Sequence, residues 1–169
     1  MGYGCDVPVI LNREYKEPAV ETLQIKSSAD LGALILDGSC DGIMLINQDG
    51  NVLVTDNCMF GILQATRVRI SKTEFISCPG CGRTLYNLQT TIAKVKKATS
   101  HLKGLKIGIM GCIVNGPGEM ADADYGYVGA GVGRISLYKG KVCVQKNIPE
   151  NEAVERLVEL IKENGDWKN

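Results

Sequence analysis

The chain has 169 residues, 44% of them hydrophobic, so it is long enough to bury a core and to form one domain, or one domain with part of a second. Its nineteen basic and nineteen acidic residues cancel, which gives no indication of binding to nucleic acid or to an acidic membrane surface. No apolar run approaches the roughly 20 residues of a membrane-spanning helix and no secretory signal is visible, so we expect a soluble, cytoplasmic protein.

The first seventy residues contain strand and helix signals in alternation. Short strands are predicted at residues 7–11, 21–26, 43–46 and 52–54. Ser27 or Ser28 can cap a helix over residues 29–36, Asp49-Gly50 is typical of a turn, and Asp56 or Asn57 can cap a second helix. Such units build barrels, but a complete barrel needs at least about 200 residues. We therefore expect residues 1–70 to be the tail of a preceding barrel-like domain.

Residues 71–169 are predicted to form one compact α/β (α+β) unit, with helices packed on a mixed sheet. Strands are expected at residues 75–76, 105–110 and 125–128, and a hairpin is expected to pair residues 135–138 with 142–144. The glycine-rich segment at residues 129–133 is interpreted as a hairpin connection, since no helix follows it as in a phosphate-binding loop. One helix is expected between Leu85 and Leu102, and a last helix opens at Pro149 and ends at Gly165.

The thiols carry most of the chemical information. Seven cysteines, an odd number without a secretory signal, favour metal binding or redox chemistry over disulfides. Cys78 and Cys81 form a Cys-x-x-Cys pair, and a strand advancing about 3.3 Å per residue can return Cys112 to the same end of the sheet. The Gly-Pro-Gly turn after it can bring Glu119 round to face the thiols. The other cysteines are interpreted as small buried hydrophobic residues: Cys5, Cys40, Cys58 and Cys143.

Three interpretations of this set remain open on the residues alone. Three thiolates and one oxygen ligand suit a four-iron cluster with one chemically distinct iron. A zinc-binding module used for assembly would need Cys112 and His101, the only histidine, but lacks the second close cysteine pair of zinc ribbons. A thioredoxin-like dithiol module would use Cys78 and Cys81 at a helix N-terminus, and leaves Cys112 and Glu119 unexplained.

Two long motifs resemble a known family. Ser77–Thr84 (SCPGCGRT) and Ile109–Asp124 (IMGCIVNGPGEMADAD) are similar to the C-terminal iron-sulfur domain of 4-hydroxy-3-methylbut-2-enyl diphosphate synthases, and the likeness extends from about Lys72 to the C-terminus. The segment after Glu119 resembles the long, three-domain form. This resemblance implies an iron-sulfur domain similar to those of sulfite and nitrite reductases, which follows barrel-type domains.

The resemblance also implies the site. A 4Fe-4S cluster would be held by Cys78, Cys81 and Cys112. Glu119 would be the exchangeable ligand of the fourth iron, and Asn115 would help to position the substrate there.

The reaction implied is an oxidoreductase step of the non-mevalonate isoprenoid pathway. It opens 2-C-methyl-D-erythritol 2,4-cyclodiphosphate to 4-hydroxy-3-methylbut-2-enyl diphosphate, with two electrons from ferredoxin or flavodoxin. The family holds the substrate diphosphate largely in its first barrel, so the fragment alone should be inactive and should work with the N-terminal barrel domains of the same enzyme. No acidic residue lies between Glu74 and Glu119, and the basic residues of this stretch suit either a solvated helix face or a docking surface for an acidic donor: Arg83, Lys94, Lys96, Lys97, Lys103 and Lys106.

Overall fold

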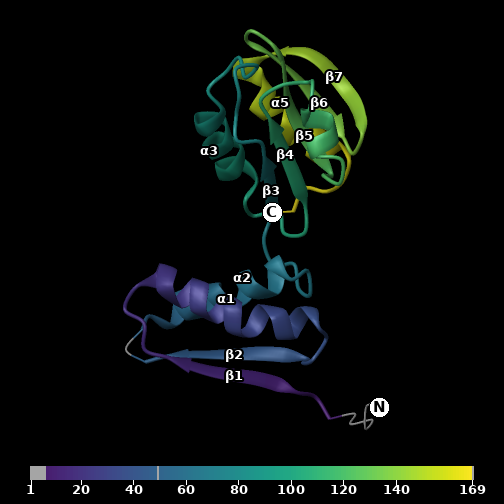
Figure 1. Ribbon diagram of the computed structural model, residues 1–169. Coiled ribbons are helices and arrows are strands. Elements are labelled where there is room, and N and C mark those ends of the chain that lie inside the picture. The colour runs from purple at the N-terminus through teal and green to yellow at the C-terminus, as the bar shows by residue number, and fades with distance from the viewer. Residues whose placement is uncertain (1–6, 49, 169) are drawn as a thin grey trace. The chain divides into compact units, whose positions relative to one another are not determined.

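The computed structural model describes residues 7–48 and 50–168. The chain divides into two compact units, Met1–Ser71 and Lys72–Asn169. Each unit has its own sheet and its own helices (Figure 1). Among the described helices, none combines the length and apolar character needed to cross a bilayer.

The first unit contains two strands and two helices in alternation: β1 (Ile10–Tyr15), α1 (Val20–Leu36), β2 (Gly42–Asn47) and α2 (Val52–Ala65). The strands pair in parallel, and both helices cover the same face of the pair (Figure 1). Leu45 on that face packs with residues of the two helices, including Leu23, Leu31 and Ile62. The other face exposes Ile10, Met44 and Ile46.

Only part of the local prediction for this unit is correct. The strand at residues 43–46 is confirmed as β2. The strand predicted at residues 21–26 is wrong, because α1 begins at Val20 and buries every fourth residue from Leu23 to Ile35, as a helix does. The strand at 52–54 is also wrong: the Asn51 side chain accepts a hydrogen bond from the Leu53 N–H at 2.9 Å and caps α2 there. The expected turn at Asp49-Gly50 includes Asp49, which lies outside the described residues.

The second unit is built on a five-stranded mixed sheet, as predicted. Its strand order is β3-β4-β5-β6-β7, where β3, β4 and β5 run parallel and β6 and β7 continue antiparallel. The elements are β3 (Glu74–Ser77), α3 (Leu88–Thr99), β4 (Lys106–Met110), α4 (Gly116–Glu119), β5 (Tyr125–Gly131), β6 (Arg134–Lys139), β7 (Val142–Pro149) and α5 (Glu150–Glu163). The glycine-rich segment joins β5 to β6 as a hairpin, which confirms its interpretation.

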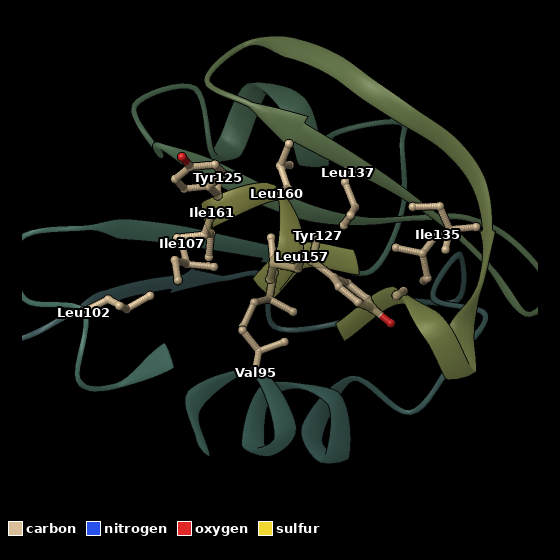
Figure 2. Packing of buried hydrophobic residues seen from close by; sticks show 13 residues of the cluster. Val95, Leu102, Ile107, Tyr125, Tyr127, Ile135, Leu137, Leu157, Leu160 and Ile161 are labelled. Atoms are coloured by element: carbon tan, nitrogen blue, oxygen red, sulfur yellow. The ribbon is translucent and has the colours of Figure 1, made fainter. Parts of the chain in front are cut away.

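Strict alternation of side chains gives this sheet two buried faces. Ile107, Ile109, Tyr125 and Tyr127 lie on one face, against α3 and α5. Figure 2 shows Val95 of α3 and a cluster from α5 that points at these strands: Leu157, Leu160 and Ile161. The opposite face carries Met110, Met120, Val128 and Tyr138. Leu157 and Ile161 of the last helix therefore belong to the core.

The helix expected between Leu85 and Leu102 is shorter than predicted. Asn87 caps α3 by accepting a hydrogen bond from the Thr90 N–H at 3.1 Å, so the helix begins at Leu88 and ends at Thr99. Leu85 precedes it and is exposed, whereas Leu102 is buried after the helix has ended.

Two glycines in adjacent strands leave a space, here called the Met120 seat, which the Met120 side chain fills. Gly108 of β4 and Gly126 of β5 are paired in register, and buried Met120 lies across both. A Cβ on Gly108 would lie 2.7 Å from Met120 Cβ, and one on Gly126 would lie 2.5 Å from Met120 Sδ. Because Met120 directly follows α4, the sheet fixes the end of that short helix and of the segment that carries Glu119.

We expect Gly126→Ala to destabilise this chain by about 1–3 kcal/mol, since an added methyl group in a packed seat forces side chains or backbone to shift. Urea unfolding followed by circular dichroism measures the change. Gly131→Ala in the same strand is the control, because its Cβ would meet only Arg134 Cβ at 4.0 Å. Equal unfolding midpoints for the two variants would contradict the role given to this seat.

Candidate functional site

The cysteine segments leave the same edge of the sheet. β3 and β4 are parallel neighbours with Ser77 opposite Ile109, so Cys78 and Gly111 follow the carboxyl ends of adjacent strands. The Gly111 N–H donates a hydrogen bond to Cys78 Sγ at 3.2 Å. The fold thus brings the Cys78–Cys81 pair and Cys112, which are separated by more than thirty residues in sequence, to one place.

A cavity of about 220 Å³ lies between these segments. A water molecule occupies about 30 Å³ in the liquid, so the space admits a group much larger than one ion. Five of the lining residues are the site residues expected from the sequence: Cys78, Cys81, Cys112, Asn115 and Glu119. Arg83 also lines the cavity, and the remaining lining is backbone-rich: Pro79, Gly80 and Gly116.

The donors do not converge on a point. In the part of the chain that the structure describes, no group of three or more histidine, cysteine, aspartate or glutamate side chains is placed to hold a single metal ion. His101 precedes β4 and Cys112 follows it, so they sit at opposite ends of a strand of about 16 Å. The His101 ring packs edge-on against Trp167, with 4.8 Å between centroids. A zinc site completed by His101 and Cys112 is therefore wrong.

The thioredoxin-like interpretation also loses its physical basis. A dithiol of that kind is activated by the N-terminus of the helix that follows it. Here the next helix, α3, starts at Leu88, seven residues after Cys81, and the residues between form turns and irregular structure.

Turns hold the first cysteine pair against the end of β4. Gly80 has a φ of +83°, which favours glycine, and the Cys81 N–H donates to Thr84 Oγ1 at 3.3 Å. Thr84 in turn packs on Gly111, where a Cβ would lie 3.1 Å from Thr84 Cβ. The Tyr86 hydroxyl donates to the Met110 carbonyl at 2.9 Å. Both contacts fasten the loop after β3 to the loop after β4.

Hydrogen bonds favour the thiolate form of Cys112. Its pKa is lowered by the backbone N–H groups of Asn115 and Val114, and further by the Arg83 guanidinium. The pKa of Arg83 is raised because Cys81, and then Cys112, accept hydrogen bonds from it. The contribution of Asn115 seen here is thus its backbone N–H, and its side chain does not cap α4.

Arg83 also lines this site, although from the sequence it was predicted only as one of the basic residues of the acid-free stretch. Lys96 and Lys97 lie in the last turn of α3, about 12 Å of helix rise beyond its first residue. Lys106 forms an ion pair with Asp122 at 2.9 Å. Of the basic residues in the acid-free stretch, Arg83 alone lines the cavity among the described residues. In the sequence, the place of Arg83 in the site was indicated by its position two residues after Cys81.

Comparison with known proteins identifies the family to which the second unit is similar. A model of the GcpE protein C-terminal domain matches residues 74–163, more than half of the chain and wholly within Lys72–Asn169. The chain belongs to the GcpE family. The likeness drawn from the two cysteine motifs is thereby confirmed.

Curated members of the GcpE family match almost the whole chain. A protein of Parabacteroides distasonis is 76% identical over 166 residues, which are 98% of this chain and 27% of that protein. A Bacteroides fragilis protein is 70% identical over 166 residues (98% and 26%), and one of Porphyromonas gingivalis is 63% identical over 165 residues (98% and 28%). Each is named 4-hydroxy-3-methylbut-2-en-1-yl diphosphate synthase (flavodoxin). The chain spans about a quarter of the length of these relatives and corresponds to their C-terminal portion.

Proposed function

We propose that this chain is the cluster-carrying C-terminal portion of an enzyme that reductively converts 2-C-methyl-D-erythritol 2,4-cyclodiphosphate to 4-hydroxy-3-methylbut-2-enyl diphosphate. The observation that carries the proposal is one cavity, lined by three cysteines and one glutamate, at the carboxyl ends of two parallel strands of a GcpE domain. The names of the relatives support the reaction.

The residues present fit a 4Fe-4S cluster. Cys78, Cys81 and Cys112 would hold three irons and Glu119 the fourth, because such clusters take thiolate ligands at separate corners. The lowered pKa of Cys112 favours the ligating form of its thiol. When bound, the cluster supplies electrons one at a time and offers one iron with an oxygen ligand.

The protein groups around the donors orient them. The Gly111 N–H donates a hydrogen bond to Cys78 Sγ and directs that thiolate, while the backbone N–H groups of Asn115 and Val114 lower the pKa of Cys112. Glu119 closes α4 and is exposed, while the adjoining Met120 is anchored on the sheet. A carboxylate is a harder and weaker ligand for iron than a thiolate, which suits an exchangeable position open to substrate.

The charged end of the substrate requires groups outside this cavity. Arg83 is the only cationic residue that lines it within the described part of the chain. A diphosphate normally takes several basic side chains or backbone donors. We propose that these groups are supplied by barrel domains N-terminal to this chain in a cytoplasmic enzyme. The electron donor would be flavodoxin, which the names of the relatives give, or ferredoxin.

The first unit suits the tail of such a barrel-like domain. A two-stranded sheet is at best marginally stable by itself, and parallel sheets are normally covered on both faces. Here α1 and α2 cover one face, and Ile10, Met44 and Ile46 are left exposed on the other. Further strands and an interior packed against these side chains would complete it.

We expect anaerobically reconstituted protein to bind about four irons and four sulfides per chain, as a 4Fe-4S cluster requires. Cys112→Ser should lower both contents, because it removes a thiolate from the cavity. Iron and acid-labile sulfide assays with visible absorption measure this, and Cys40→Ser, a change in the first unit, is the control. A colourless protein with about one zinc per chain would contradict the proposal.

A further inference from the structure

We propose that Arg83 raises the reduction potential of the cluster because its guanidinium lies beside Cys81 and Cys112 in the thiol cavity. The inference rests on the proposed function, because it assumes the cluster in this cavity. Arg83 is given a positioning and tuning role, since a guanidinium has no lone pair with which to bind iron.

The position of Arg83 in the fold is the first support. Beside the thiol cavity lies a second cavity of about 240 Å³, lined by Leu85, Gly111, Ile113 and Val114 together with the last three residues of β5. Arg83 and Cys112 are the two residues that line both cavities. The arginine thus extends from the loop after β3 to the cysteine after β4, where it meets thiols from both segments.

The partners of Arg83 are the second support. Arg13 and Arg156 form ion pairs with carboxylates, at 3.0 Å and 3.2 Å. Arg83 instead lines the cavity that Cys78, Cys81 and Cys112 also line, and the pKa of its guanidinium is raised by Cys81 and Cys112. The sequence around it carries no acidic residue from Phe75 to Gly118. Glu119 is the one carboxylate among the residues that line the cavity, so the charge of Arg83 acts mainly on the three thiolates there.

The physical consequence concerns the reduced state. Adding an electron makes the cluster more negative, so a nearby cation and N–H donors to its sulfurs stabilise the reduced form more than the oxidised form. A planar guanidinium has five donors and can serve two sulfur atoms at once, whereas a lysine ammonium acts as a single point charge. The Gly111 N–H already holds Cys78 Sγ at 3.2 Å, so Arg83 is not required to hold that thiolate in place.

The test uses the full-length enzyme with its cluster reconstituted anaerobically. Arg83→Gln, Arg83→Lys and a control, Lys94→Gln, are compared with wild type by redox titration followed by electron paramagnetic resonance. Lys94→Gln removes the same charge from an exposed position on α3. Iron and sulfide contents are measured first, so that potentials are compared at equal cluster loading.

We expect Arg83→Gln to lower the equilibrium constant for one-electron reduction about tenfold, a shift of about 59 mV to more negative potential. Arg83→Lys should shift it in the same direction by less, and Lys94→Gln should leave it near wild type. A potential unchanged in Arg83→Gln overturns the inference. So does an unchanged potential with a raised KM, which would make Arg83 a substrate contact.

Variants at Arg83 that fold but hold no cluster would also overturn it, because the arginine would then act in assembly. If the wild-type enzyme binds no iron, the proposed function itself fails. That result is distinguishable from an unchanged potential in an enzyme with a full cluster.

Discussion

Replacing Glu119 with cysteine is expected to reduce kcat of the full-length enzyme by at least about 100-fold while a cluster is retained, an effect comparable to misplacing a reacting group by about 1 Å. Glu119 lines the thiol cavity, so a thiol at this position can complete a four-cysteine set. A fourth thiolate binds iron more tightly than a carboxylate and closes the exchangeable position. Steady-state rates with iron and sulfide assays on the same samples measure both effects.

Two further variants give this prediction its controls. Glu119→Ala should weaken iron retention, since it leaves one donor missing from the cavity. Glu152→Cys adds a thiol at an exposed carboxylate in the first turn of α5, outside the cavity, and should keep both cluster and activity. If Glu119→Cys and Glu119→Ala both turn over at the wild-type rate, Glu119 has no part in the mechanism.

The isolated 169-residue chain is expected to show no measurable turnover of the cyclodiphosphate, even with its cluster and a chemical reductant. Positioning of reactants can be worth effective molarities of about 10⁵–10⁸ M, and this chain offers Arg83 as the one cation at its cavity within the described residues. Product formation by the chain and by the full-length enzyme is compared at equal cluster content. Rapid turnover by the chain alone would mean that the substrate site lies within it.

The thiol site could be predicted from the sequence because its residues are set by local spacing. A Cys-x-x-Cys pair after one strand and a cysteine two residues after the end of the next parallel strand meet at one edge, and the register of Ser77 with Ile109 shows that they do. The strand and hairpin predictions of the second unit succeeded for a related reason, since alternating apolar residues such as Ile107 and Ile109 fix the buried face.

The wrong strand predictions arose because short runs with β-branched residues were interpreted without the residues that flank them. Val52 and Val54 suggested a strand, yet the cap supplied by Asn51 and the burial of Thr55, Cys58 and Ile62 belong to a helix. The role proposed for Arg83 was not visible either, because Arg83 and Cys112 line the same cavities only once the folded sheet brings their two loops together.

The pairing of β3 with β4 also orders events in time. Cys78 leaves the ribosome about 34 residues before Cys112, an interval of roughly 2–7 s at a synthesis rate of about 5–20 residues per second. During that interval the nascent chain presents two thiols without the third, and no Gly111 N–H faces Cys78. The complete donor set exists only after the parallel strands have docked, so a group that needs all three thiols can be bound only after β4 has been synthesised.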